Sequence, residues 1–301
     1  MNPKEIHFIA VNYFVIDLRM IRLEKNITKF LEKFAKTSKP ITILTGAGIS
    51  AESNIPTFRG PEGFWTIGSK EYHPQEMATY RMFKLTPWEV WKWYLYRLDI
   101  CRKAEPNPGH IAISEMEKYF KNRFTLITQN VDNLHLRAGN SLSNTYQIHG
   151  NIFFSRCAQE CSFQIYPVPE NLKARKTIED LSEYERNMLI CPNCGGILRP
   201  HILWFDETYN EQYYHYLSSI QAAEKTELLI IVGTSGATNL PNMVAMEVKR
   251  HNGIIIDINI EENLFTNLAV SGKQGGSGKQ GGFIKGKSSD ALPAIMQILT
   301  H

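Results

Sequence analysis

Continuous apolar runs that end in polar or glycine-containing segments dominate the pattern of this chain. Four of these runs resemble strands that are buried on both faces, at 41–44, 123–130, 227–235 and 253–261. Such runs are typical of parallel strands, and in open α/β sheets ligands bind at the carboxyl ends of the strands. The pattern therefore predicts a parallel α/β sheet of the Rossmann-like kind, with candidate site residues directly after its strands.

Two stretches have helical spacing. In the first, 26–39, Asn26 is a candidate N-cap and Pro40 follows just before the first strand. The second, 86–103, is rich in aromatic residues, and together with the residues before it, from about 61 to 105, it is expected to form a helical cap over the sheet. The apolar face of the first helix consists of Ile27, Phe30, Leu31 and Phe34.

The pattern changes between about 151 and 203, where two pairs of cysteines flank a charged helical segment. We interpret this region as an inserted small module. The predicted organisation is a large α/β domain made of 26–150 and 204–301, with helices on both faces of its sheet, that carries the module at 151–203. The length of 301 residues suits one large domain with a smaller one attached.

The charge of the chain argues against one class of function. Its formal net charge of +3 is spread along the sequence, whereas dedicated nucleic-acid binders concentrate Lys and Arg on one face or tail. No direct nucleic-acid partner is therefore expected.

An apolar stretch near the N-terminus, 6–16, spans 11 residues. It is too short to cross a bilayer, and no small-residue cleavage pattern follows it. We expect a packed strand or helix here rather than a targeting signal, and no membrane contact. The predicted location is cytoplasmic.

A direct repeat, "SGKQGG", occupies 271–276 and again 277–282. A glycine-rich repeat cannot pack a core, so flexibility is expected there. It fits a natural loop expansion and an engineered linker equally well, and it predicts no function.

Four of the five cysteines fall in two tight pairs, Cys157 with Cys161 and Cys191 with Cys194. In a chain without a signal peptide this spacing favours a metal over disulfides, and four thiolates suit one structural zinc ion. The alternative is four reduced cysteines without a metal. A catalytic zinc is not expected, because four thiolates leave no open coordination position. Cys101 is expected to be a small buried residue.

The first strand is followed by "TGAGISAESNIPTFRG" (45–60), which matches G-x-G-x-x-A through Gly46, Gly48 and Ala51. A hydride-transferring Rossmann enzyme places an acidic residue about 20 positions further on, at the end of a second strand. Glu71 lies near that distance, but no convincing strand ends there. The glycine motif alone is therefore weak evidence for any one chemistry.

Further polar residues follow the next strands. Gln129, Asn130 and Asp132 occur close together in "TQNVDNLHLRAGN", and His149 precedes a glycine in "YQIHGN". Side chains of this kind suit recognition of an amide and a ribose, and a histidine there could act as a general base. Alternatively, His149 is a hydrogen-bonded structural histidine, and Asn130 and Asp132 are turn residues.

The motifs taken together resemble the sirtuin family of NAD-dependent protein deacylases. The motifs "TGAGISAESNIPTFRG", "TQNVDNLH", "IHGN", the two cysteine pairs, "LRPHILWFDE", "VGTSG" and "INIEEN" occur in this order. The resemblance extends from about residue 27 to 300. It implies a Rossmann-like NAD-binding domain with a small zinc-binding module.

The resemblance also assigns residues to the parts of NAD. Gly46, Ala47, Gly48 and Ser50 would line the phosphate-binding turn, and Phe58 and Arg59 would belong to the loop that folds over the nicotinamide ribose. Gln129, Asn130, Asp132 and the backbone amide of Val131 would surround that ribose and the nicotinamide. Gly233, Thr234, Ser235, Asn259, Ile260 and Glu261 would bind the adenosine side, and Ser288 would lie near adenine.

His149 matches the catalytic base of the family. The implied reaction joins the acyl oxygen of a modified lysine to the anomeric carbon of the ribose as nicotinamide leaves. The histidine then takes a proton from a ribose hydroxyl, and water completes the route to free lysine and O-acyl-ADP-ribose. The substrates are acyl-lysine peptides or proteins. "HILWFDE", with Leu203, Trp204 and Phe205, would be an edge that pairs with the substrate strand.

The nature of the acyl group is a finer question. "AESNIPTFRG", with Ala51 and Thr57, resembles the branch that removes succinyl and malonyl groups. Tyr94 and Arg97 are three positions apart on the cap helix, as in that branch, so they could converge on one carboxylate. Removal of acetyl groups also fits the resemblance. The alternative for the pair is that Tyr94 packs in the aromatic cap and Arg97 is a solvated charge.

Two residues depart from the family pattern. Asn54 replaces a usual glycine, which is tolerable because Asn also adopts left-handed conformations, and Asn239 stands where a small apolar residue is common. The rival functions are an NAD glycohydrolase or ADP-ribosyltransferase, and a non-enzymatic zinc-containing module that senses NAD. A hydride-transfer enzyme is the least favoured.

Overall fold

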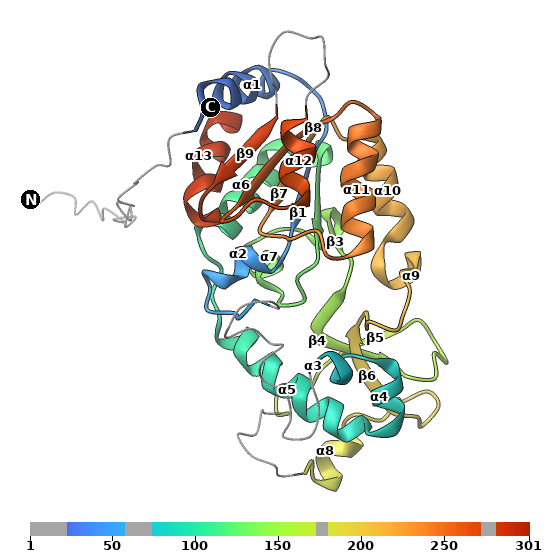
Figure 1. Ribbon diagram of the computed structural model, residues 1–301. Helices are drawn as coiled ribbons and strands as arrows, with labels where there is room; N and C mark the ends of the chain where they lie inside the picture. Colours follow the sequence, from blue (N-terminus) through green and yellow to red (C-terminus); the bar gives the residue numbers. More distant parts are fainter. Residues whose placement is uncertain (1–22, 58–73, 173–179, 272–280) are drawn as a thin grey trace, which may run out of the picture.

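The computed structural model describes residues 23–57, 74–172, 180–271 and 281–301 (Figure 1). Within these residues the strands form two sheets, and the larger has six strands in the order β3-β2-β1-β7-β8-β9. Every neighbouring pair in this larger sheet is parallel. Its strands are β1 (Ile41–Thr45), β2 (Phe124–Thr128), β3 (Thr145–Gln147), β7 (Leu228–Val232), β8 (Ile254–Asn259) and β9 (Gly282–Lys285).

The strand order reverses between β1 and β7. Counted along the chain within this sheet, the order is 3-2-1-4-5-6, which is that of the Rossmann fold. Ligands of such sheets bind beyond the carboxyl ends of the two strands at the reversal. The predicted α/β class is thus confirmed. The topology predicts that a ligand binds at the turns that follow β1 and β7.

Helices cover both faces of the larger sheet, and alternate residues of each strand point to opposite faces. Ile43 and Ile230 belong to one apolar core, whereas Leu44 and Ile231 belong to another. The first core is completed by α1 (Lys25–Ala35), α6 (Pro108–Phe120) and α13 (Ser288–Thr300). The second is completed by α10 (Tyr216–Lys225), α11 (Asn239–Arg250) and α12 (Leu264–Val270).

The smaller sheet is antiparallel and lies at the opposite end of the molecule from α1 and α13 (Figure 1). Its strands are β4 (Gly150–Cys157), β5 (Ile165–Pro167) and β6 (Leu198–Ile202). The cap consists of α3 (Pro74–Met77), α4 (Tyr80–Leu85) and α5 (Pro87–Lys103). The sequence predicts a cap over the parallel sheet, but the cap residues, such as Trp91, share one apolar core with Ile152 of the smaller sheet and with Trp204, which follows β6.

The remaining described elements are short. They are α2 (Ala47–Ala51), α7 (Leu134–Arg137), α8 (Glu183–Asn187), α9 (Glu211–Tyr214) and the 3-10 turns at Lys121–Arg123 and Leu142–Asn144. Among the helices of the described ranges, none combines the length and the apolar character needed to cross a membrane.

One boundary prediction is wrong, and several predictions fall outside the described residues. Asn26 lies inside α1, because the carbonyl of Glu24 already accepts the N–H of Thr28 at 3.0 Å and Glu24 is the N-cap. The predicted buried face of α1 is confirmed by Ile27, Leu31 and Phe34. The stretch 6–16, Phe58, Arg59, Glu71 and most of the "SGKQGG" repeat lie outside the described ranges.

Candidate active site

The turns after β1 and β7 meet at the strand reversal. The N–H of Gly46 donates to the carbonyl of Val232 at 2.9 Å, and the N–H of Gly48 donates to that of Gly233 at 2.8 Å. A Cβ atom on Gly48 would lie 2.6 Å from the Cα of Gly233, so only glycine permits this approach. Protein carbonyls therefore already accept from both of these amides. Ala47, which begins α2 and is half-buried, lies between them.

Three of the predicted polar residues form one buried network. Ser50 donates to the carboxylate of Asp132 at 2.7 Å, and the side-chain amide of Asn130 donates to Ser50 at 3.1 Å. The same amide donates to the carbonyl of Gly46 at 3.0 Å. Burial raises the pKa of Asp132, while the N–H of Leu134 and the hydroxyl of Ser50 act in the opposite direction. The network ties the segment after β2 to the turn after β1, with Val131 half-buried between Asn130 and Asp132.

Gln129 connects the turn after β7 with His149. Its side-chain amide donates to the hydroxyl of Thr234 at 2.9 Å, and its side-chain oxygen accepts from Thr238 at 3.0 Å. Its backbone carbonyl lies 3.0 Å from Nδ1 of His149. Gln129 therefore holds three parts of the site together.

The contacts of His149 determine which of its ring nitrogens carries a proton. A carbonyl only accepts, so Nδ1 carries the hydrogen that bonds to Gln129, and Nε2 of the neutral ring keeps a free electron pair. Nε2 accepts from the hydroxyl of Tyr209 at 2.8 Å. Burial lowers the pKa of His149 to about 4, with the Gln129 carbonyl acting in the opposite direction. The ring is therefore neutral near pH 7, with Nε2 as its basic nitrogen.

The predicted adenosine-side residues follow β7 and β8. Gly233 has a φ of 58° and Thr234 is buried, and the carbonyl of Thr234 accepts from the side chain of Asn259 at 3.0 Å. Ser235, Ile260 and Glu261 are exposed beyond the strand ends.

Ser288 begins α13 and is buried. Its hydroxyl donates to the carboxylate of Glu52 at 2.6 Å. The predicted adenine-proximal residue thus has an internal partner, and it links α13 to the segment after α2.

Tyr94 and Arg97 lie together inside the cap. Both side chains are buried, and the guanidinium of Arg97 lies 4.6 Å from the ring centre of Trp93 and 5.4 Å from that of Tyr94. The Tyr94 hydroxyl accepts from the indole N–H of Trp204 at 2.8 Å. Burial raises the pKa of Tyr94 to about 12 and lowers the pKa of Arg97. The alternative that Arg97 is a solvated charge is therefore wrong. Ala51 is exposed at the end of α2.

In the predicted substrate-docking edge, the backbone N–H groups of Leu203, Trp204 and Phe205 already donate hydrogen bonds to other parts of the protein. The N–H of Leu203 donates to the carbonyl of His149 and that of Phe205 to the carbonyl of Ala78, each at 3.0 Å, and that of Trp204 donates to the carboxylate of Glu207 at 2.9 Å. A substrate strand that paired with these amides would have to displace those acceptors.

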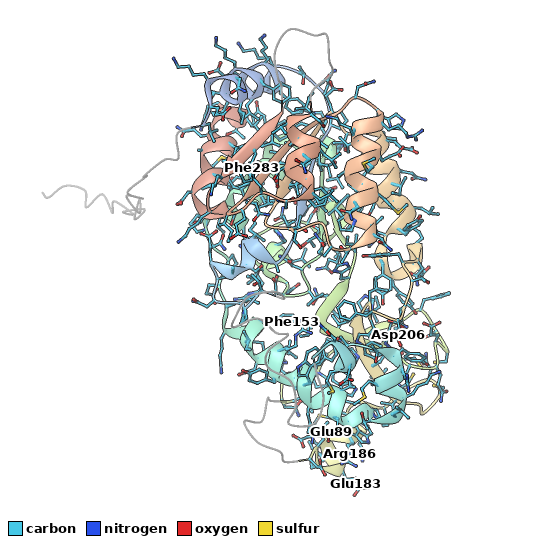
Figure 2. All side chains as sticks on the ribbon, viewed as in Figure 1. Glu89, Phe153, Glu183, Arg186, Asp206 and Phe283 are labelled. Atoms are coloured by element: carbon cyan, nitrogen blue, oxygen red, sulfur yellow. The ribbon has the colours of Figure 1, made fainter. Side chains whose placement is uncertain are left out.

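Asp206, labelled in Figure 2, anchors the same edge to the cap. Its carboxylate accepts from the N–H groups of Tyr80 at 2.7 Å and Arg81 at 3.0 Å, in the first turn of α4. These N–H groups have no partner within their own helix, and a carboxylate stabilises them through both hydrogen bonding and charge.

The four cysteines predicted to bind a metal converge at one point of the small module. Their sulfur atoms all lie within 4.8 Å of one another, and the Cys157–Cys194 and Cys161–Cys191 sulfur distances are 3.5 and 3.6 Å. All four cysteines are free, whereas the sulfurs of a disulfide are about 2.05 Å apart. A tetrahedral zinc ion with bonds of about 2.3 Å places its sulfurs about 3.8 Å apart, so the cluster fits one structural zinc. Cys101, in contrast, is buried in the cap, as predicted.

Tyr209 is the functional candidate that sequence reasoning missed. It lies between β6 and α9, beyond the "HILWFDE" motif and among other tyrosines. No spacing or motif distinguishes it from its aromatic neighbours.

Comparisons with known proteins agree with this geometry. The sequence profile of the Sir2 family matches residues 46–239. An NAD-dependent protein deacylase of Leptospira interrogans is 37% identical over 276 residues, covering 91% of this chain and 97% of the relative. The mitochondrial NAD-dependent protein deacylase sirtuin-5 of Danio rerio is 36% identical over 261 residues, covering 81% of each chain.

Solved structures of similar fold include complexes with the dinucleotide or its product. A mutant Sir2 homologue in complex with ADP-ribose has a TM-score of 0.73 and 30% identity, covering 92% of this chain and 96% of the other. A Sir2 homologue–NAD complex has a TM-score of 0.71 and 32% identity, covering 90% and 93%.

Proposed function

This chain belongs to the Sir2 family and is an NAD-dependent protein deacylase, and we propose that His149 is the base of its reaction on acyl-lysine side chains. The observation that carries the proposal is the state of the ring. The Gln129 carbonyl fixes the hydrogen on Nδ1, so Nε2 presents its electron pair at the edge where the two sheets meet. The lowered pKa keeps that nitrogen unprotonated at neutral pH.

Several residues of this chain would each have a separate role around bound NAD. Bound NAD supplies the anomeric carbon that receives the acyl oxygen when nicotinamide leaves. Asn130 and Asp132 hold the segment after β2 against the turn after β1, and the Gln129 carbonyl holds His149, which would lie beside the ribose of bound NAD. Nε2 would accept the proton of a ribose hydroxyl, and with one water molecule consumed the products would be nicotinamide, free lysine and O-acyl-ADP-ribose.

His149→Ala tests this proposal. We expect kcat/KM for deacylation to fall by about 10² to 10⁴, the range of a general base, while far-UV circular dichroism and the thermal unfolding midpoint stay near wild type. The matched control is His251→Ala, an exposed histidine at the end of α11. Normal deacylation by His149→Ala would refute the assignment. Nicotinamide release by the wild type without any deacylated peptide would favour the rival NAD glycohydrolase or ADP-ribosyltransferase.

We further propose that the enzyme prefers acyl groups that carry a carboxylate, such as succinyl and malonyl. The support is the buried pair in the cap. A guanidinium presents a planar fork that matches a carboxylate, and burial strengthens such a charged contact. Trp204 donates to the Tyr94 oxygen, so the hydroxyl hydrogen of Tyr94 is available for another acceptor. Ala51, exposed at the end of α2, has a small side chain that would leave room for an acyl chain.

The acyl preference is tested by comparing acetyl, malonyl and succinyl versions of one peptide with wild type and Arg97→Met. Losing a charge-assisted contact worth about 1.5–3 kcal/mol should lower kcat/KM for the acidic acyl groups by about tenfold to a hundredfold. Deacetylation should change less than about threefold. Lys103→Met, which removes an exposed cation from the same helix, is the control. Unchanged desuccinylation in Arg97→Met would refute the preference.

A further inference from the structure

Tyr209 is the only side chain among the described hydrogen bonds that reaches Nε2 of His149. The residue is half-buried in the segment between β6 and α9, and it packs against the apolar core beneath α10 and α11. Its hydroxyl is 2.8 Å from Nε2, and the two ring centres are 5.9 Å apart. This is a direct hydrogen bond to the nitrogen that must later receive a proton.

A neutral imidazole nitrogen has one electron pair in the ring plane, so it accepts one strong hydrogen bond at a time. A ribose hydroxyl that gives its proton to Nε2 must therefore take the position that the Tyr209 hydroxyl now holds. We propose that Tyr209 is a positioning residue whose hydroxyl stands in for the ribose hydroxyl until NAD displaces it. This inference rests on the proposed role of His149 as the base.

The surroundings offer the displaced hydroxyl a second partner. The side chain of Thr238, before α11, lies close enough to the Tyr209 hydroxyl to influence its pKa. Thr238 also donates to the side-chain oxygen of Gln129 at 3.0 Å, and the carbonyl of Gln129 accepts from Nδ1 of His149. The four residues thus form a chain of hydrogen bonds from Tyr209 through His149 and Gln129 to Thr238. The Thr238 oxygen keeps an electron pair that can accept from Tyr209 once NAD displaces it from Nε2.

The arrangement has a consequence for NAD binding. While the site is without NAD, Tyr209 satisfies Nε2 and holds the imidazole in the orientation that the reaction needs. Binding of NAD exchanges one hydrogen bond to Nε2 for another, so Tyr209 reduces the affinity for NAD without taking part in proton transfer. The ribose proton moves to Nε2, and Tyr209 keeps its own.

Tyr209→Phe removes the competing hydroxyl and keeps the ring. We expect the Kd for ADP-ribose, measured by calorimetry, and the KM for NAD to fall by about threefold to tenfold, or about 0.7–1.4 kcal/mol. The kcat should stay within about threefold of wild type. Tyr216→Phe is the matched control, because Tyr216 packs against the same apolar core. Unchanged or weaker ADP-ribose binding in Tyr209→Phe would overturn the proposal.

The ¹⁵N NMR spectrum of ¹⁵N-histidine-labelled protein detects the hydrogen bond between Tyr209 and His149 without an activity measurement. Without ligand at pH 8, the His149 Nε2 resonance of Tyr209→Phe should move toward the position of an imidazole nitrogen that accepts no hydrogen bond. ADP-ribose should bring wild type and variant together. Identical unliganded spectra would overturn the role of Tyr209. Normal activity of His149→Ala would instead refute the base assignment, so the two failures are distinguishable.

Discussion

The glycines after β1 work through their lack of a side chain. Gly46 and Gly48 allow the turn after β1 to form hydrogen bonds with the turn after β7. A Cβ atom on either glycine would lie 2.6 Å from an atom of that second turn. This requirement belongs to the strand reversal of the sheet and not to any reaction. The same glycine spacing therefore serves enzymes that reduce a dinucleotide and enzymes that cleave one. On the proposed function, the chemistry is determined by the residues after β2 and β3.

Asp257 is a buried carboxylate that should make stability depend on pH. It lies on β8, where one of its oxygens accepts from Thr266 at 2.6 Å and from Asn263 at 3.0 Å, and burial raises its pKa to about 6. A folded-state pKa above the unfolded value of about 3.8 stabilises the fold at low pH, and this contribution is lost as the pH rises through about 6. The full difference of about 2 pKa units corresponds to about 3 kcal/mol.

We therefore expect the free energy of unfolding of wild type, relative to Asp257→Asn, to fall by about 1.5 kcal/mol between pH 5 and pH 8. Urea denaturation of both proteins across this range measures the difference. Asp99→Asn, which alters a carboxylate with 36% of its side chain exposed on α5, should show less than about 0.5 kcal/mol of such change. A difference between wild type and Asp257→Asn that does not vary with pH would contradict the prediction.

At the scale of elements, the sequence predicted those that bury long apolar runs. β1, β2, β7 and β8 each keep four or five buried residues, and α1 and α5 have clear apolar positions. β3 and β9 span only three and four residues, so no periodicity could establish them. Their pairing comes from the neighbouring strands, which is tertiary information.

For the candidate site, too, the sequence predicted the local features but not the long-range contacts. The cysteine cluster and the residues after β2 follow from spacing and from family motifs. The amides of Gly46, Gly48 and Phe205 have partners far away in the chain, and the contact of Tyr209 with His149 joins residues 60 positions apart. Such pairings depend on how the two sheets are placed, which no local pattern encodes.

At the scale of the whole molecule, the proposed active site lies where the two sheets are joined. His149 comes directly before β4, and Leu203, directly after β6, donates to the His149 carbonyl. The residues proposed to surround the dinucleotide follow β1, β2, β7 and β8, whereas Tyr94 of the proposed acyl pocket and Trp204 belong to the core shared by the cap and the smaller sheet. On the proposed function, the larger sheet would serve NAD and the smaller sheet would serve the acyl-lysine.

This division predicts that the zinc ion is needed for deacylation more than for NAD binding. Cys194→Ser should lower the zinc content, measured by plasma mass spectrometry, from about one ion per chain toward zero. Loss of the metal should loosen β4–β6, which would appear as faster hydrogen exchange in 150–202. Because these strands flank His149 and support Trp204, kcat/KM for deacylation should fall by about tenfold or more.

The Kd of the same variant for ADP-ribose should stay within about threefold of wild type, because the residues proposed to bind ADP-ribose follow strands of the larger sheet. Cys101→Ala is the matched control: this thiol is buried in the cap, away from the cluster, and burial raises its pKa to about 12. The control should keep its zinc and its activity. If Cys194→Ser lost its zinc and still deacylated normally, the smaller sheet would hold the acyl-lysine site without the metal. If ADP-ribose binding fell as much as deacylation, the two sheets would not act separately.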